Sequence, residues 1–140
     1  MIIKQKGKPE MKEVYDFLKK CGTYYLATEE GDQPRVRPFG TVDIFDDRLY
    51  IQTGRANKVS GQIEKNPKVE ICAFDGERWI RIEAVAVEDS RLEPKEHMLD
   101  AYPDLKPMYK ADDGNTQVFY LSEAVATIMS FTDAPRIIRF

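Results

Sequence analysis

Basic side chains recur at two places in the sequence where they could bind an anion. Arg35 and Arg37 are two residues apart in a stretch that reads as a strand, so their side chains lie on the same face. The stretch "TGRANK" (53–58) places Arg55 and Lys58 between an expected strand and an expected helix. Because a helix N-terminus carries free N–H groups and partial positive charge, this connection is suited to bind a phosphate.

Both features also have an ordinary structural explanation. Arg35 and Arg37 could belong to a solvated strand face that pairs with acids on neighbouring strands. In TGRANK, Gly54 could serve only a turn and Asn57 only the helix cap, with Lys58 directed into solvent. The G-x-x-x-x-G-K-S/T pattern of a Walker loop is absent. The residues alone therefore leave an anion site and a polar connection open.

Few other residues in the sequence are of a type and spacing that indicate catalysis or metal binding. His97, the only histidine, falls on an expected surface helix without ligand partners at a useful spacing. Cys21 and Cys72 form no C-x-x-C and read as small buried hydrophobes, so neither a metal site nor a disulfide is expected. Trp79, the only tryptophan, is expected to pack in a strand. No catalytic residue can be assigned, and an enzyme built from these residues would depend on a bound cofactor.

The composition fits a single domain over residues 1–140. Hydrophobic residues make up 42% of the chain and aromatic residues 11%, which supports a core and excludes a disordered protein. The net charge of −3 and the pI near 5.3 argue against a nucleic-acid partner, although they allow a small basic pocket. Since neither a signal peptide nor a membrane span is visible, we expect a cytoplasmic protein without a membrane partner.

Strand patterns dominate the chain, and three helices accompany them. Helices are predicted over 9–21, 57–66 and 93–102. Strands are predicted over 23–28, 34–45, 48–53, 68–74, 78–88, 116–122 and 125–131, followed by a short tail over 135–140. The first three strands read as an antiparallel meander. Six to seven antiparallel strands with flanking helices predict a mainly-β fold, a small β-barrel that protects its edges, with an open α+β sandwich as the alternative.

The order of these motifs resembles a known family. "FLKKCGTYYLATEEGDQPRVRPFG", "LYIQTGRANKVSGQIEKNPKVEICAF" and "WIRIEAVAV" follow one another as in the pyridoxamine 5′-phosphate oxidase-related, FMN-binding split-barrel proteins. The resemblance covers roughly residues 10–132 and is greatest to the short bacterial members described as general stress or nitroimidazole-resistance-like proteins. It implies a split β-barrel that forms a homodimer, with FMN at the subunit interface.

The resemblance also implies which residues bind the cofactor. The flavin phosphate would be held by Thr53 and Lys58, with assistance from Arg35 or Arg37. Ile51 and Gln52 would run beside the flavin ring, and Trp79 or the strand over 127–130 would close the site from the partner subunit. The full set of expected FMN-binding residues is Arg35, Val36, Arg37, Pro38, Ile51, Gln52, Thr53, Lys58 and Val59.

The family implies an oxidoreductase in which FMN passes hydride or electrons between a nicotinamide or similar donor and a small-molecule substrate. The alternative is a non-catalytic protein that binds flavin or another phospholigand as a stress-response or sensor module. The tail "PRIIRF" does not match the substrate-binding Arg and His residues of true pyridoxamine 5′-phosphate oxidases, so that particular reaction is not expected. The family also includes members that use a deazaflavin or haem in place of FMN.

Overall fold

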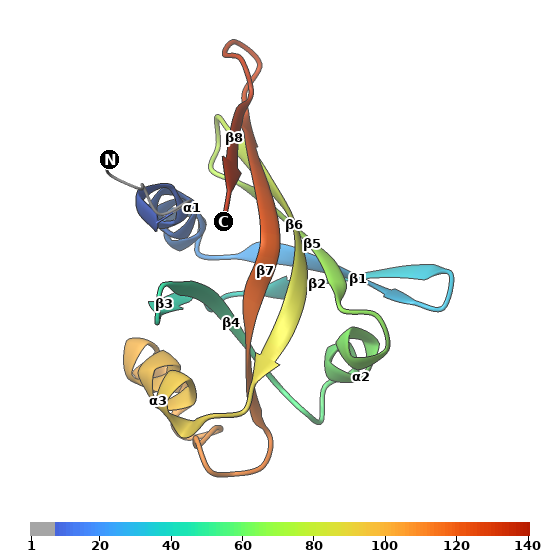
Figure 1. The fold of residues 1–140 in the computed structure, drawn as a ribbon, viewed down its shortest axis with the longest axis vertical. Helices are drawn as coiled ribbons and strands as arrows, with labels where there is room; N and C mark the ends of the chain where they lie inside the picture. Colours follow the sequence, from blue (N-terminus) through green and yellow to red (C-terminus); the bar gives the residue numbers. More distant parts are fainter. Residues whose placement is uncertain (1–7) are drawn as a thin grey trace, which may run out of the picture.

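A computed structural model describes residues 8–140 of the chain, so the first seven residues of the domain predicted over 1–140 lie outside the described residues. Three α-helices, one 3-10 helix and eight strands are formed by the described residues (Figure 1). The helices are α1 (Lys8–Cys21), α2 (Lys58–Lys65), α3 (Leu92–Ala101) and η1 (Pro103–Leu105). The strands are β1 (Tyr24–Glu30), β2 (Gln33–Phe39), β3 (Asp43–Phe45), β4 (Arg48–Gly54), β5 (Lys68–Phe74), β6 (Trp79–Asp89), β7 (Thr116–Met129) and β8 (Arg136–Arg139).

All eight strands belong to one antiparallel sheet. Its order is β2-β1-β5-β6-β7-β4-β3, and β8 pairs with β7 outside this path. β2 and β3 end the path without pairing to each other, so the sheet curls but does not close. This is the mainly-β, split-barrel arrangement that the sequence predicts, with one strand more than expected. None of the described helices is both long and apolar enough to cross a membrane.

The three α-helices lie around the curled sheet and contact different strands (Figure 1). The apolar side of α1 adds Met11, Val14, Phe17 and Leu18 to the main core, where Leu26, Ile71 and Ile82 are fully buried. Gly22 follows the last residue of α1 and terminates the helix; it has a φ of 75° and donates its N–H to the Leu18 carbonyl at 3.0 Å. The smaller helix α2 buries Val59 and Ile63 against the same core.

The prediction of one continuous strand over 34–45 is wrong. The chain leaves the sheet at Gly40 after β2 and re-enters it at Asp43 as β3. β2 pairs only with β1, and β3 pairs only with β4, so the two hairpins lie at opposite ends of the sheet order. The expected three-stranded meander is therefore two separate hairpins. Thr41 and Val42 are β-branched residues typical of strands, but both are buried in the loop between β2 and β3.

The C-terminal strands also differ from the prediction. The two strands expected over 116–122 and 125–131 form one long strand, β7, which bends at Glu123, a residue with a φ of 51°. The register with β6 shifts at the same place, between Glu83 and Val85, as in a β-bulge. The tail expected over 135–140 is the strand β8, and the β7–β8 hairpin extends away from the body of the domain (Figure 1).

Candidate functional site

Basic side chains gather in a hollow between β2 and the N-terminal end of α2. We call this hollow the basic pocket. It has a volume of about 370 Å³ and is lined by Glu30, Arg35, Val36, Arg37, Asn57, Lys58, Val59 and Gln62. Two stretches that are distant in the sequence, Arg35 to Arg37 and Asn57 to Val59, thus meet at one place. They meet because β1, which pairs with β2, also contacts α2.

Arg37 is held in place by hydrogen bonds from three directions. Its guanidinium donates to the Leu26 carbonyl at 3.1 Å and to Thr28 Oγ1 at 2.8 Å, both on β1. A third, short hydrogen bond runs to Oε1 of Gln62, a buried residue of α2. Burial, together with the charge of Arg35, lowers the pKa of Arg37 below its ordinary value. The sequence placed Arg37 on the correct face but gave no indication that Gln62 would fix it.

Arg35 is more exposed, and its partner is a carboxylate. Nε and Nη2 of Arg35 lie 3.2 Å and 2.9 Å from Oε1 of Glu30, which is the last residue of β1. The other carboxylate oxygen of Glu30 accepts from Gln62 Nε2 at 3.4 Å. The hydrogen bond from Arg35 is the main reason that the pKa of Glu30 lies below its ordinary value, and the charge of Lys58 acts in the same direction. A carboxylate therefore sits among the cations of the pocket.

Lys58 is the first residue of α2, and no other described residue forms a hydrogen bond or an ion pair with its ammonium group. The preceding residue, Asn57, occupies the N-cap position as predicted, but its side chain does not cap the helix. Instead, Asn57 Nδ2 donates to Thr53 Oγ1 at 3.1 Å. The N–H groups of Lys58 and Val59 consequently have no acceptor among the described residues, and this end of α2 remains suited to an anion.

The rest of TGRANK is occupied by structural contacts. Asn115 accepts hydrogen bonds from the Arg55 N–H through its carbonyl at 2.7 Å and from the Ala56 N–H through Oδ1 at 2.9 Å. The Arg55 side chain pairs with Glu88 at 2.9 Å, outside the pocket. A Cβ atom on Gly54 would lie 2.9 Å from Asn115 Nδ2, so a larger residue would have to displace this side chain, and no positive φ is involved. Only the last residues of the motif face the hollow.

A second, larger hollow continues along the same strands. We call it the aromatic pocket; its volume is about 570 Å³, and its lining includes Phe39, Tyr102 and Tyr109. Pro38 at the end of β2 and the pair Gln52 and Thr53 near the end of β4 border it. Both hollows therefore border β2 and the chain from β4 into α2, which would allow one elongated ligand to occupy both.

The expected FMN-binding residues divide between these two hollows. Arg35, Val36, Arg37, Lys58 and Val59 line the basic pocket, and Pro38, Gln52 and Thr53 line the aromatic pocket. Ile51 lines neither, because its side chain is fully buried in the core. Sequence reasoning missed Glu30 and Gln62. Glu30 lies beyond the strand predicted over 23–28. Gln62 lies three residues after Val59, at helical spacing, and a glutamine on the apolar side of a helix was a signal that could have been used.

His97 has a partner that the sequence did not suggest. Its Nδ1 lies 2.5 Å from Oδ2 of Asp43, and this contact joins α3 to β3. Burial raises the pKa of the Asp43 carboxyl, while the contact with His97 opposes that rise. Neither residue lines the basic or the aromatic pocket. Among the described residues, no group of three or more His, Cys, Asp or Glu side chains is placed to hold a metal ion.

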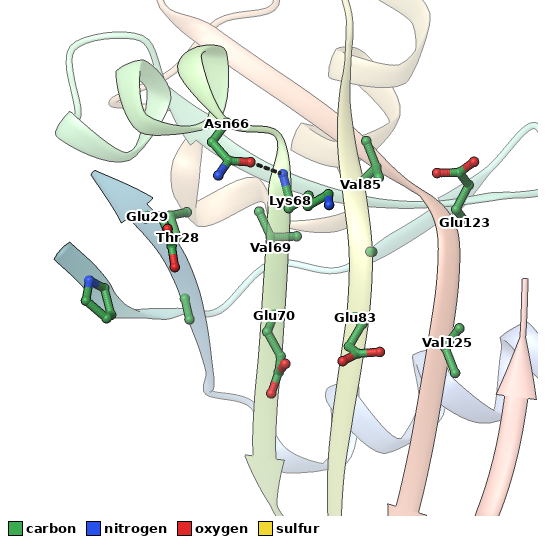
Figure 2. A pocket seen from close by; sticks show the side chains of 13 residues that line it. Thr28, Glu29, Asn66, Lys68, Val69, Glu70, Glu83, Val85, Glu123 and Val125 are labelled. Carbon is green, nitrogen blue, oxygen red and sulfur yellow. Dashed lines mark hydrogen bonds between the residues drawn. The ribbon is translucent and has the colours of Figure 1, made fainter. Parts of the chain in front are cut away.

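A third hollow lies on the outer face of the sheet, across β1, β5, β6 and β7 (Figure 2). We call it the acidic groove. It measures about 620 Å³ and contains four glutamates, Glu29, Glu70, Glu83 and Glu123, with Lys68 among them. Further along the outer face, Trp79 packs against Phe131, with ring centroids 5.2 Å apart, and Phe131 is 90% exposed. Trp79 thus packs against another side chain, as predicted, but it does so on the surface and not in the core.

The sequence was compared with known families and proteins. The profile of the family described as pyridoxamine 5′-phosphate oxidase matches residues 11–102. A crystal structure of a NimC/NimA family protein from Clostridium acetobutylicum is 44% identical, with a TM-score of 0.90, over 93% of this chain and 92% of that one. No curated protein matches the sequence.

More distant structures share the fold. General stress protein 26 from Bacillus anthracis is 21% identical, with a TM-score of 0.73, and the match covers 94% of this chain and 99% of that one. A pyridoxamine 5′-phosphate oxidase-related, FMN-binding protein from Nostoc punctiforme is 12% identical, with a TM-score of 0.61, over 93% of this chain and 95% of that one. At these identities the similarity establishes the split-barrel architecture alone.

Proposed function

Because the chain belongs to the pyridoxamine 5′-phosphate oxidase family, we propose that it is an FMN-binding flavoprotein and an oxidoreductase acting on a small molecule. The observation that carries this proposal is the basic pocket, where the Lys58 ammonium forms no hydrogen bond or ion pair with a described residue and Arg37 is fixed by three hydrogen bonds. A phosphomonoester carries a charge of about −1.5 to −2 at pH 7, so it suits a pocket with an excess of cations.

The residues present fit the phosphate of FMN. Lys58 and Arg37 would supply charge-assisted hydrogen bonds, and the N–H groups at the start of α2 would supply two further donors. Thr53 Oγ1 already accepts a hydrogen bond from Asn57 and can still donate its own hydrogen. Arg37, Thr53 and the N–H groups are held by the sheet or by α2, so only the Lys58 side chain would have to be ordered on binding.

The flavin ring would extend into the aromatic pocket along Pro38, Gln52 and Thr53. When bound, FMN supplies hydride or electron transfer between a reduced nicotinamide and a small acceptor. The role of this chain would be to bind and orient the cofactor and to shield the ring with apolar side chains such as Phe39 and Met108. Some members of the family bind cofactors other than FMN. The expected contact between the basic pocket and a phosphate group is the feature that favours FMN over haem.

We propose that the functional unit is a cytoplasmic homodimer with FMN at the subunit interface. The outer face of the sheet exposes apolar side chains, since Tyr25 is 52%, Phe74 60% and Ile137 52% exposed. A second copy would cover such a surface. Trp79 and Phe131 belong to the same face, which supports Trp79 as the side chain that closes the site of the partner.

Titration of the purified protein with FMN tests this function. We expect the visible flavin spectrum to change on binding and the flavin fluorescence to be quenched, with one FMN per chain. A protein that leaves both signals unchanged at micromolar FMN would not have the proposed function. Sedimentation of the complex at several protein concentrations would test the dimer separately.

A non-catalytic flavin carrier or sensor is the second candidate. The location of His97 favours it, because the one histidine of the chain is engaged with Asp43 and lines neither pocket. Stopped-flow mixing of the FMN complex with NADH or NADPH distinguishes the two candidates. Rapid bleaching of the flavin absorbance indicates an oxidoreductase, whereas a stable oxidised spectrum indicates a carrier or a sensor.

A further inference from the structure

One cation of the aromatic pocket has no part in the function proposed above. Lys19 lies in the last turn of α1 and lines this pocket, with its Nζ 4.5 Å from the centre of the Tyr102 ring. The next residue, Lys20, pairs with Asp75 Oδ2 at 3.6 Å. Lys19 forms no ion pair with a described carboxylate, although the buried Asp43 acts on it through its charge. The Lys19 ammonium is therefore a candidate binding group for a ligand of the pocket.

The Tyr102 hydroxyl holds this ammonium in place. The hydroxyl donates to the Val42 carbonyl at 3.1 Å and accepts from the Val42 N–H at 3.0 Å. It also accepts from Lys19 Nζ at 3.2 Å, so neither its hydrogen nor a lone pair is left for a ligand. This hydrogen bond is the main reason that the pKa of Lys19 lies above its ordinary value. An ammonium group carries three hydrogens, so Lys19 keeps donors for a ligand.

The other walls of the aromatic pocket suit a flat ligand. Phe39 and Tyr109 contribute aromatic rings, and Met108, which is 67% exposed, adds a flexible apolar side chain. Lys19 and Asp104 are the charged side chains among the described lining residues. With one cation in the lining, a ligand with two negative charges would leave one of them uncompensated. These features together favour a small planar molecule with a single negative charge.

The flavin ring and such a molecule would contact different parts of the lining. The ring is expected against Pro38, Gln52 and Thr53, which belong to β2 and β4. Lys19 belongs to α1, and residues 101–105 of the lining belong to the end of α3 and to η1. A molecule held against this second wall would lie beside the ring, as a substrate of the flavin must.

We propose that Lys19 binds the carboxylate of the substrate, so that the substrates of the proposed oxidoreductase are small, planar, aromatic or conjugated carboxylates. This inference rests on the proposed function, since it names the substrate class of the same site. A carboxylate forms a charge-assisted hydrogen bond with an ammonium group, which a neutral amide of the same shape cannot match.

Calorimetric titration with trans-cinnamate and trans-cinnamamide tests the proposal. The two probes share a planar, conjugated skeleton, and only cinnamate is charged. We expect the FMN-saturated wild type to bind cinnamate about tenfold more tightly than cinnamamide, and Lys19→Met to remove this preference. Because Lys19 is exposed, the preference should narrow in about 1 M salt. Equal affinities or no cinnamate binding in the wild type would overturn the proposal, as would a preference that survives in Lys19→Met.

The neighbouring lysine provides a matched control. Lys20 carries the same charge in the same turn of α1 but does not line the aromatic pocket. Lys20→Met should keep the preference for cinnamate within about twofold of the wild type. Loss of the preference in Lys20→Met would overturn the proposal, because it would indicate a general effect of net charge.

A third variant tests the positioning role of the Tyr102 hydroxyl. Tyr102→Phe keeps the aromatic wall and removes the acceptor of Lys19. It should narrow the ratio of cinnamate affinity to cinnamamide affinity by about threefold, because the ammonium would have to be ordered on binding. A purely structural effect would weaken both probes equally, and an unchanged ratio would contradict the positioning role.

Titration of the apo-protein separates this inference from the proposed function. Absence of FMN binding, together with a preference for cinnamate that depends on Lys19, would refute the proposed function and leave Lys19 as a carboxylate-binding residue. FMN binding without that preference would refute the inference alone. Displacement of FMN by cinnamate would also overturn the inference, because the flavin and not a substrate would then occupy the place beside Lys19.

Discussion

The basic pocket and the acidic groove lie on opposite faces of the same strand, β1, and differ in both charge and order. Glu30 faces the basic pocket, whereas Glu29, one residue earlier, faces the acidic groove. In the basic pocket, Arg37 and Glu30 are fixed through the buried side chain of Gln62. In the acidic groove, Glu83 forms no hydrogen bond or ion pair with another described residue, and Glu70 has only Arg81, at 3.5 Å.

This difference separates a binding site from a charged surface. Side chains that are held in one arrangement before a ligand arrives can bind it without paying the entropy of ordering. Carboxylates with one weak partner or none, such as Glu70 and Glu83, are not ordered in this way. Strand alternation places these two environments on either side of β1, so the net charge of −3 describes neither of them. The following predictions test whether the two regions differ in this way, from the largest expected effect to the smallest.

The largest effect is expected at Lys58. Replacing it by Met removes a charge-assisted phosphate contact of about 1.5–3 kcal/mol and should lower FMN affinity by about 10- to 100-fold. Lys65→Met is the control, since Lys65 ends the same helix and does not line the pocket. Fluorescence titration of both variants measures the difference. If Lys65→Met weakened FMN binding as much as Lys58→Met, the basic pocket would have no special role.

The next effect is expected at Gln62. Gln62→Leu removes the acceptor of Arg37 and of the Thr28 hydroxyl, which lies 2.6 Å from Gln62 Oε1. Leaving buried donors unpaired should cost about 1–3 kcal/mol of unfolding free energy and lower FMN affinity by about tenfold. Urea unfolding of the apo-protein and flavin titration report the two effects separately. Glu70→Gln in the acidic groove should leave FMN affinity unchanged; a loss of FMN affinity there would remove the distinction between the two regions.

Some residues of the basic pocket could be predicted from the sequence, and others could not. Arg35, Arg37 and Lys58 could be identified because strand spacing, a helix start and charge are local features. Glu30 and Gln62 could not, since their roles depend on contacts between β1, β2 and α2. The split of the strand predicted over 34–45 was missed for a related reason. Thr41 and Val42 are β-branched and read as strand residues, whereas tertiary packing buries both of them in a loop.

A third prediction concerns the packing that positions Lys58. Gly54→Ala would place a Cβ atom 2.9 Å from Asn115 Nδ2 and 3.1 Å from Tyr109 Cε1, so it should destabilise the fold by about 1 kcal/mol or more. Gly61→Ala is the matched control, because a Cβ there meets nothing within 4 Å and the position is an exposed one in α2. That variant should stabilise the protein by about 0.4–1 kcal/mol. Thermal unfolding of both variants checks the opposite signs, and equal shifts would contradict the close-packing explanation of Gly54.

The smallest effect is expected in the acidic groove itself. Glu70 and Glu83 stand directly opposite each other on β5 and β6, and like charges in that arrangement destabilise a sheet. Glu83→Gln should therefore raise the free energy of unfolding by about 0.2–0.5 kcal/mol. The effect is small because Arg81 already pairs with Glu70 and offsets part of the repulsion. The gain should disappear in about 1 M salt, because exposed charges are screened there. Thermal unfolding at equal protein concentrations in low and high salt measures it. A loss of stability on removing this carboxylate would mean that the groove holds its glutamates as firmly as the basic pocket holds its arginines.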